Sequence, residues 1–256
     1  MTNFDEPRSF YDIRERFSSI PNRYEEIPRI SSVRRLLEQM SFQWRVNRTS
    51  IKYLDIGCGD CNGTTRFSKF ISEVTKMTVE TVGIDKSLQC AIPCNEQKIQ
   101  FLKLDLNNEP IPFSNHFQII TIFETIEHIF ETDYLLQCVH NTVSKDGIIF
   151  ITTLNVVCWK NRILVPLGIQ PINTEVSTKR LSHGYRLNFI KKRVDFWKPS
   201  GHIRPFTLYS LQDLLFDNNF IVIDSFGLEN WRLFKFFERI SKNMCTGILV
   251  VARPHK

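Results

Sequence analysis

Short apolar runs alternate with longer amphipathic segments along the middle of the chain. The short runs predict buried β-strands, and the segments whose apolar residues recur every three to four positions predict helices. Strands are expected at residues 51–56, 79–85, 98–104, 117–123 and 147–153, with helices at roughly 63–76, 87–94 and 132–143. This order predicts an α/β fold, in which a parallel sheet carries helices on both faces. The carboxyl ends of the strands then lie along one edge, where such sheets bind their ligands.

The residues before the first predicted strand follow a helical pattern. Apolar or aromatic residues stand at positions 10, 13, 17, 33, 36, 37 and 40, and two prolines, Pro21 and Pro28, interrupt them. We therefore expect two amphipathic helices within a leading segment, residues 1–50. The segment either covers a bound ligand as a lid or packs on the sheet, and the pattern leaves both alternatives open.

Length and composition limit the class of protein. The chain has 256 residues, of which 42% are hydrophobic, so residues 51–256 are expected to form one domain with one core. The longest apolar stretch, Gly147 to Trp159, is too short to span a membrane, and no apolar leader opens the chain, so a cytoplasmic location is expected. The odd count of seven cysteines predicts reduced thiols. Cys58 and Cys61 have C-x-x-C spacing without a convincing second pair, which favours positions in a ligand loop over a metal or redox site.

A glycine-studded loop follows the first predicted strand. Residues 52–65 read K-Y-L-D-I-G-C-G-D-C-N-G-T-T. Gly57 and Gly59 allow backbone dihedrals closed to other residues and let a ligand approach the backbone closely. A dinucleotide-binding loop needs glycine or alanine three residues after its second glycine, where this chain has Asn62. The loop therefore disfavours a nicotinamide-dependent oxidoreductase.

Acidic residues stand at or near the ends of the first three predicted strands, at Asp55, Asp85 and Asp105. Any one of them alone is most simply a helix cap or a turn residue. Three acids at the spacing of successive strand-helix units indicate instead that they share one ligand at the edge of the sheet.

Residues 53–157 resemble the catalytic core of the class I S-adenosylmethionine-dependent methyltransferases. The matching segments are D-I-G-C-G, G-I-D, L-D-L, F-E-T-I-E-H and S-K-D-G-I-I-F-I-T-T-L-N, in the expected order. By pattern, the chain is most similar to the ubiquinone-biosynthesis O-methyltransferases and to methyltransferases associated with glycan synthesis. Cys61 departs from the family motif, which has its third glycine at this position.

The resemblance implies a Rossmann-like, doubly wound and mostly parallel sheet of seven strands. It would close with a helix at 207–217 and an antiparallel hairpin formed by strands at 219–226 and 246–252. The resemblance also implies S-adenosylmethionine as cofactor, bound by Asp55, Gly57, Gly59, Asp85, Asp105, Leu106 and Phe123. Asp85 would accept hydrogen bonds from the ribose hydroxyls and Asp105 from the adenine amino group, with Leu106 against the ring.

An E-x-x-E-H pattern, Glu124, Glu127 and His128, follows the fourth predicted strand. In a helical turn these side chains would project from one face. The pattern resembles the metal-binding signature of small-RNA 3′-terminal 2′-O-methyltransferases and of some ubiquinone O-methyltransferases, which implies His202 as a further ligand. Mg²⁺ or another divalent ion bound by all four residues would lower the pKa of an acceptor hydroxyl.

Two alternatives to a metal site stay open for this pattern. His128 or His202 could act as a general base. In the other alternative, Glu124 and Glu127 cap a helix and His128 is buried in its packing. Under either functional hypothesis the predicted catalytic residues are Glu127, His128 and His202.

Positive charge is concentrated between Trp159 and Arg204. This stretch has ten basic residues (Lys160, Arg162, Lys179, Arg180, Arg186, Lys191, Lys192, Arg193, Lys198 and Arg204) and two acidic ones (Glu175 and Asp195), whereas the other 23 basic and 25 acidic residues give the rest of the chain a net charge of −2. Residues 159–204 lie where the family usually carries its acceptor-binding insertion. Aromatic residues interleave with the cations, so a nucleotide, a sugar, a lipid diphosphate or an anionic membrane surface could bind there. A solvated basic face is an equally simple explanation.

These features favour an S-adenosylmethionine-dependent O-methyltransferase acting on a small-molecule or glycan- or lipid-linked hydroxyl, with an anionic acceptor as one option. An RNA 2′-O-methyltransferase is an alternative, although no recognisable RNA-binding module accompanies the basic insertion. A second alternative is a protein that binds S-adenosylmethionine without catalysis. The acceptor, contact with a membrane surface and the oligomeric state are not determined by the sequence.

Overall fold

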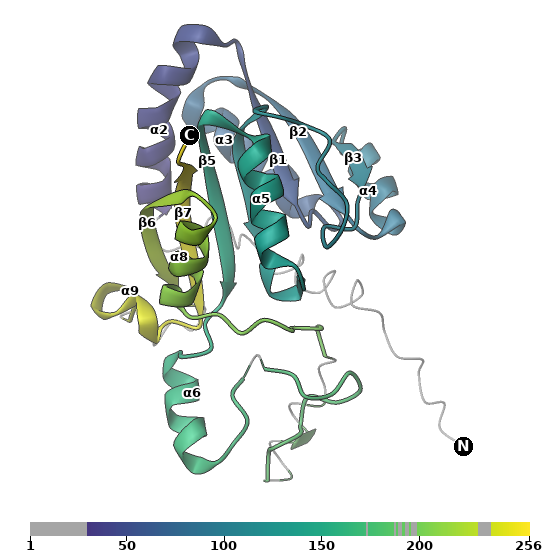
Figure 1. Ribbon diagram of the computed structural model, residues 1–256, viewed down its shortest axis with the longest axis vertical. Helices are drawn as coiled ribbons and strands as arrows, with labels where there is room; N and C mark the ends of the chain where they lie inside the picture. The colour runs from purple at the N-terminus through teal and green to yellow at the C-terminus, as the bar shows by residue number, and fades with distance from the viewer. Residues whose placement is uncertain are drawn as a thin grey trace.

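A mixed seven-stranded sheet forms the centre of the computed structural model, which describes residues 30–172, 174–186, 188, 191–192, 195, 199–229 and 237–256 (Figure 1). The strand order is β3-β2-β1-β4-β5-β7-β6. Strands β1, β2, β3, β4 and β5 are parallel, and β7 runs antiparallel to both β5 and β6. The strands are β1 (Ser50–Ile56), β2 (Thr78–Asp85), β3 (Gln100–Lys103), β4 (Phe117–Phe123), β5 (Val143–Leu154), β6 (Phe220–Leu228) and β7 (Gly247–Pro254). The predicted fold is confirmed, including its closing hairpin.

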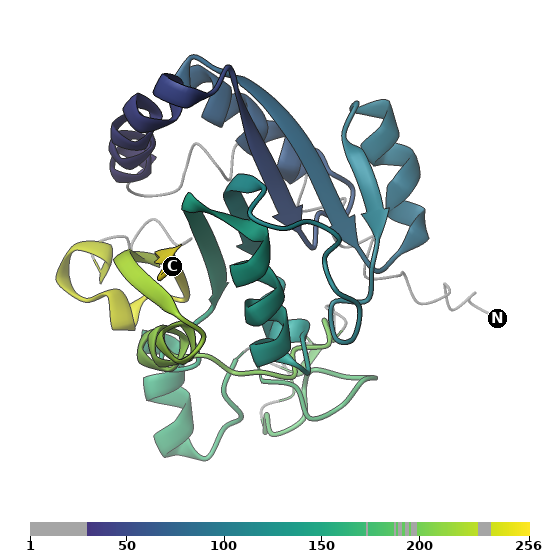
Figure 2. The same cartoon turned by 45° about the horizontal axis from the view of Figure 1, so that its top comes forward.

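Helices cover both faces of the sheet, as the alternating pattern predicts. On one face, α2 (Ile30–Asn47) and α3 (Asn62–Thr75) bury Leu37, Trp44 and Ile71 against β1, β4 and β5. On the other face, α5 (Thr132–Thr142) and α8 (Leu208–Asp217) bury Leu135 and Leu211 (Figure 2). The described residues also form three short helices: α4 (Ala91–Glu96) beside β3, α6 (Trp159–Leu164) after β5, and α9 (Phe237–Ile240) before β7. The carboxyl ends of the parallel strands lie together along one edge of the sheet between these helical layers.

Helix α2 is fastened to the sheet by its carboxyl-terminal end. The Trp44 ring is fully buried, and its Nε1 donates to the backbone oxygen of Asp146 at 3.1 Å. The Arg48 guanidinium binds the carboxylate of Asp146 at 2.5 Å. Burial alone would raise the pKa of Asp146, but the hydrogen bond and charge of Arg48 outweigh burial and leave that pKa lowered. This half of the leading segment therefore packs on the sheet. The other predicted helix lies outside the described residues, so the lid stays a prediction for that part.

Two predicted boundaries differ from the structure. Strand β5 begins at Val143, four residues before its predicted start, because Val143 pairs with Phe117 ahead of an irregularity after which Ile119 pairs with Ile148. Strand β3 is confined to Gln100–Lys103, and none of its four residues is fully buried, as fits its place at the edge of the sheet.

The basic insertion leaves the sheet at the carboxyl end of β5 (Figure 1). It begins with α6 and a 3₁₀ turn, Val165–Leu167, and returns to the sheet where Asn155 forms a parallel bridge with Phe206. Phe206 accepts a backbone hydrogen bond from Val156 at 2.9 Å. The segment just before Phe206 is thereby held at the edge where the strand ends carry acids. Within the described ranges, no helix combines the length and apolar character needed to cross a bilayer.

Candidate functional site

The loop after β1 is held against the end of β2 by its own backbone. The amides of Gly57 and Cys58 both donate to the oxygen of Ile84, at 2.8 and 3.0 Å, and the Gly59 amide donates to Oδ2 of Asp85 at 3.0 Å. Gly57 and Gly59 have φ of 76° and 54°, and Cys61 has φ of 59°. Cys61 thus adopts the left-handed conformation for which glycine is the usual residue. At the position where the family motif has its third glycine, this chain therefore has a different residue but keeps the backbone conformation typical of glycine.

Asp55 lies beneath this loop with most of its surface buried. Its Oδ1 accepts from the Thr121 hydroxyl at 2.6 Å, and its Oδ2 accepts from the hydroxyl of Thr64 in α3. Asp55 therefore joins β1, β4 and the first turn of α3, which fixes the direction in which the loop leaves the sheet. Direct contact between Asp55 and a cofactor stays a prediction.

Asp85 and Asp105 lie at the ends of the two neighbouring strands. Besides the Gly59 amide, Asp85 accepts from the Ser87 amide at 2.9 Å. Asp105 is bound by the Lys86 ammonium at 2.7 Å, and the hydrogen bonds of Lys86 and Asn107 lower its pKa to about 2. Asp105 is therefore ionised throughout the physiological range and can only accept hydrogen bonds, as a partner for an amino group must.

Two apolar residues predicted to bind the cofactor flank these acids. Leu106 follows Asp105 directly and belongs to the core cluster beneath α5. Phe123 ends β4, and its ring meets the Phe67 ring of α3 edge-on, with 5.4 Å between ring centroids. The structure thus brings the strand ends of β1, β2 and β4 and the residues just after β3 to one edge. Whether each side chain contacts a cofactor stays a prediction.

The turn after β4 differs from the predicted helical turn. Glu124 has a φ of 48°, and its amide donates to the backbone oxygen of Thr152 at 3.1 Å. The Thr125 hydroxyl contacts the backbone oxygens of Phe123 and Ile56, at 2.9 and 3.3 Å. Because of these contacts, helical geometry begins only at Ile126, in a 3₁₀ turn that spans Ile126–His128. Consequently, Glu124 is exposed and does not share a face with the two residues that follow.

Three of the four predicted metal ligands come together at this turn. One ligand atom from each of Glu127, His128 and His202 lies within 4.8 Å of the other two. The Glu127 backbone oxygen accepts from the amides of Ile203 and Arg204, at 2.9 and 3.0 Å. His128 Nδ1 lies 3.1 Å from the backbone oxygen of Gly201, and the two imidazole centroids are 4.9 Å apart. The returning segment of the insertion therefore docks His202 against the turn after β4, and Glu124 lies outside the group.

Glu127 and His202 each have a buried polar atom without a hydrogen-bond partner. In Glu127, which is 2% exposed, Oε2 accepts from the Thr153 hydroxyl at 3.0 Å, whereas Oε1 has none. Nδ1 of His202 likewise makes no hydrogen bond, although a carboxylate oxygen of Glu175 lies 3.4 Å from it. Burial, and next the charge of Glu124, raise the pKa of Glu127 well above its usual range. Both residues line a cavity of about 10 Å³, close to the space of a single water or ion. A buried acid and imidazole with unused lone pairs are suited to bind a cation or a proton.

Glu175 is a site residue that the sequence analysis did not single out. Its Oε1 and Oε2 accept from the amides of Ser200 and Gly201, at 2.7 and 2.8 Å, and Oε1 lies 3.4 Å from His202 Nδ1. Burial and the neighbouring His128 lower the pKa of His202, and Glu175 partly opposes them. Its presence as one of only two acids in the basic insertion was the available signal.

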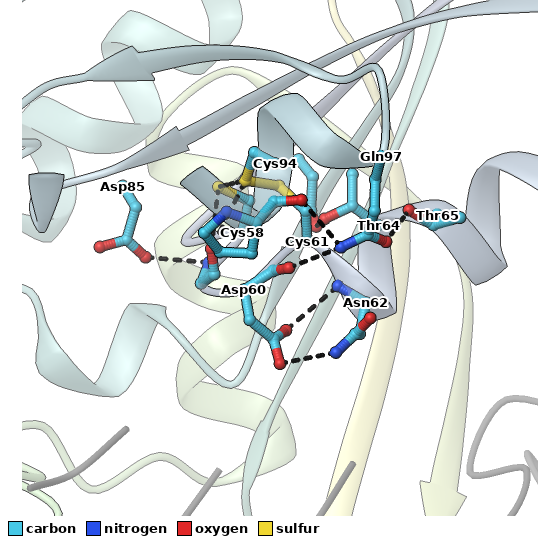
Figure 3. The surroundings of a disulfide bond; sticks show 12 residues. Cys58, Asp60, Cys61, Asn62, Thr64, Thr65, Asp85, Cys94 and Gln97 are labelled. Atoms are coloured by element: carbon cyan, nitrogen blue, oxygen red, sulfur yellow. Dashed lines mark hydrogen bonds between the residues drawn. A yellow bond between two sulfur atoms is a disulfide. The ribbon is translucent and has the colours of Figure 1, made fainter. Parts of the chain in front are cut away.

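The cysteines of the loop differ from expectation. Cys61 forms a disulfide with Cys94 of α4, so the prediction of reduced thiols is wrong for these two residues (Figure 3). The two Cα atoms are 5.1 Å apart, within the range that a disulfide bridges without backbone movement. Their separation of 33 positions hides this proximity from the sequence. The other five cysteines are outside any disulfide.

Comparisons with known proteins agree with this architecture. The sequence profile of a methyltransferase domain matches residues 25–225. The ubiquinone biosynthesis O-methyltransferase of Pelagibacter ubique is 31% identical over 111 residues, which are 41% of this chain and 43% of that protein. The mitochondrial ubiquinone biosynthesis O-methyltransferase of Candida albicans is 30% identical over 152 residues, covering 54% of this chain and 44% of the relative. The matches thus span less than half the length of these relatives.

Solved structures share the fold at low sequence identity. A methyltransferase from Thermotoga maritima, described as S-adenosylmethionine-dependent and as a possible histamine N-methyltransferase, aligns with a TM-score of 0.53 and 14% identity, over 97% of this chain and all of its own. An S-adenosylmethionine-dependent methyltransferase from Aquifex aeolicus aligns with a TM-score of 0.53 and 12% identity, over 96% of this chain and 98% of its own. These similarities establish the fold.

Proposed function

The chain belongs to the methyltransferase-domain family as an S-adenosylmethionine-dependent methyltransferase, and from this premise we propose that it methylates a hydroxyl group with the help of a divalent metal ion. The acceptor is a small molecule or a hydroxyl linked to a glycan or lipid. The observation that carries the proposal is the group that Glu127, His128 and His202 form at the turn after β4.

The strand-end residues have distinct roles in this proposal. S-adenosylmethionine supplies a methyl group on a positively charged sulfonium. Asp85 already orders the loop through the Gly59 amide and would accept hydrogen bonds from the ribose hydroxyls. Asp105 would accept a hydrogen bond from the adenine amino group. Because transfer consumes the sulfonium charge, alignment and exclusion of water contribute more than strong acids would.

The chemistry of an alcohol acceptor supports a role for the carboxylate and the imidazoles. A hydroxyl is a weak nucleophile that must lose a proton, and a divalent cation held by Glu127, His128 and His202 would lower its pKa. Oxygen and imidazole donors suit Mg²⁺ or Mn²⁺ and also Zn²⁺ or Fe²⁺. Oε1 of Glu127, which is buried without a hydrogen-bond partner, favours this ion over a purely structural role. Glu124 remains a proposed fourth ligand, which would have to turn toward the group.

The surface of the insertion supports an amphipathic or anionic acceptor. Exposed cations include Arg162, Lys179 and Arg180, and exposed apolar residues of α6 and the following turn include Ile163 and Leu167. Cations beside apolar surface suit a molecule that joins a charged group to a ring or a chain. The same cations also suit RNA, which remains the second candidate acceptor.

A transfer screen tests the proposed function. The protein is incubated with S-adenosylmethionine carrying a radiolabelled methyl group and with separate small-molecule, glycan, lipid and RNA fractions. We expect label in one of the first three fractions. Label confined to RNA would replace the proposal with RNA 2′-O-methylation, and cofactor binding without label in any fraction would contradict catalysis on these acceptors.

Replacing Glu175 with alanine is expected to reduce methyl transfer about 10- to 100-fold and to raise the metal concentration needed for half-maximal activity. The carboxylate holds Ser200 and Gly201 and faces His202 Nδ1, so its loss releases the imidazole from its orientation. Transfer rates are measured against metal concentration for Glu175→Ala and Glu175→Asp, with Thr178→Ala, an exposed position of the same insertion, as control. An unchanged metal requirement in Glu175→Ala would mean that Glu175 does not position His202.

A further inference from the structure

Three sulfur atoms lie close together, two from the loop after β1 and one from α4. Cys61 and Cys94 are bonded, and Sγ of Cys58 lies 4.0 Å from Sγ of Cys94 (Figure 3). All three side chains are buried, and Cys58 keeps its thiol. The disulfide joins the loop after β1 to α4, which follows β2. The proposed methyl transfer gives none of these sulfur atoms a role.

The disulfide acts on a residue with an unfavourable backbone conformation. Cys61 has φ of 59° at the N-terminal end of α3, and its own side chain makes no capping hydrogen bond to the helix. A non-glycine residue keeps this conformation only when the surrounding structure enforces it. Backbone hydrogen bonds contribute, from the Cys61 amide to Cys58 and from the Thr65 amide to Cys61. The bond to Cys94 adds a covalent tether to the same residue.

The tethered residue and the cofactor contacts belong to one short loop. Two residues before Cys61, the Gly59 amide binds the carboxylate of Asp85. The next residue, Asp60, has its backbone oxygen bound by Nε2 of Gln97, at the end of α4, at 2.9 Å. Opening the disulfide would therefore leave α4 attached through Gln97 and keep the two sulfur atoms within reach, so the bond can form again.

We propose that Cys61 and Cys94 form a thiol–disulfide site whose oxidation state sets the affinity of the loop for S-adenosylmethionine. A small disulfide such as oxidised glutathione forms the bond: it takes two electrons from the two thiols, and two molecules of reduced glutathione leave with the two protons. A dithiol reverses the step and is itself oxidised to a cyclic disulfide. In the oxidised protein the loop is held ready for the cofactor, whereas in the reduced protein cofactor binding must also order Cys61.

Cys58 provides an internal route for releasing Cys61 from the tether. After losing its proton to solvent, its thiolate attacks the sulfur of Cys94; a bond between Cys58 and Cys94 forms as the bond between Cys61 and Cys94 breaks. Cys61 leaves as a thiolate at the N-terminal end of α3, where the helix dipole stabilises negative charge, and it then takes up a proton. This exchange needs no external oxidant.

The proposal is tested on the full chain by calorimetry with S-adenosylmethionine after treatment with oxidised glutathione or with dithiothreitol. Alkylation of the unfolded protein should count five thiols in the first sample and all seven in the second. We expect the reduced protein to bind the cofactor on the order of tenfold more weakly, from the cost of the left-handed conformation. The test does not depend on the acceptor, so it stands apart from the proposed hydroxyl methylation.

Three variants separate the tether from general effects on folding. Cys94→Ser should bind like the reduced protein under both conditions, and Cys58→Ser should still respond. Cys61→Gly, which has no thiol and tolerates the left-handed conformation, should bind like the oxidised protein under both conditions. The proposal would be overturned if the protein with five thiols and the protein with seven bound S-adenosylmethionine equally well. It would also be overturned if seven thiols remained after oxidation, or if the affinity of Cys94→Ser changed between the two treatments.

Discussion

Replacing Gly57 with alanine is expected to weaken S-adenosylmethionine binding by roughly 100-fold or more, from strain and overpacking together. A Cβ atom at this position would lie 2.1 Å from Oγ1 and 2.7 Å from Cγ2 of Thr125. Thr125 has little freedom to retreat, because its hydroxyl already contacts the backbone oxygens of Phe123 and Ile56. With φ of 76°, alanine would also be strained where glycine is not. The loop would therefore be pushed away from the turn after β4, on which Thr125 lies.

Calorimetry with S-adenosylmethionine measures this effect, and two variants separate its causes. Gly168→Ala imposes a similar backbone strain, at φ of 67°, but its Cβ meets nothing within 4 Å, so cofactor binding should not change. In the double variant Gly57→Ala/Thr125→Gly, the clashing atoms are absent, and part of the affinity should return. Binding by Gly57→Ala as tight as in the unchanged protein would mean that this loop is not the cofactor site.

Replacing Glu127 or His202 with alanine should reduce methyl transfer by roughly 100- to 1,000-fold, the scale expected when a group that stabilises the reacting oxygen is lost. Cofactor affinity should stay within about threefold, because the proposed cofactor contacts come from other residues. Glu124→Ala should have a smaller effect, since that residue is exposed and outside the group. Rates are measured on the acceptor found in the transfer screen, with the exposed Glu73→Ala in α3 as control.

The same assays distinguish the three explanations of the group. Metal assistance predicts that a chelator abolishes transfer and that added divalent metal restores it. A general base predicts loss of activity in His202→Ala but no response to the chelator. If Glu127→Ala and His202→Ala transfer methyl groups at the unchanged rate, the group is structural and the proposed mechanism is wrong.

The central sheet could be predicted because its strands carry strong local signals. Residues 117–123 form an uninterrupted, mostly apolar run, and β4 occupies those residues. Its burial on both faces, at the centre of the sheet, is the physical reason for that run. Edge strand β3 carries a weaker pattern, and its limits were predicted less well. The prediction that the strand ends share one edge of the sheet is therefore correct.

The details of the site depended on contacts between distant residues. Glu124 was expected on a helical face, but backbone bonding to Thr152 and the packing of Thr125 under Gly57 set a left-handed turn instead. Cys94 gave no signal of its bond to Cys61, because the bond depends on how α4 packs beside the loop. His202 was identified through a family resemblance, and its docking through the Glu127 backbone oxygen emerged only in three dimensions.

The central claim is that a methyl group passes from S-adenosylmethionine to an oxygen atom. The most direct test uses a cofactor with a ¹³C-labelled methyl group, the acceptor found in the transfer screen, and carbon NMR of the purified product. The account predicts a single labelled methyl group bonded to oxygen, formed by the unchanged protein and absent with Glu127→Ala. A labelled methyl group on nitrogen, carbon or sulfur would contradict the claim.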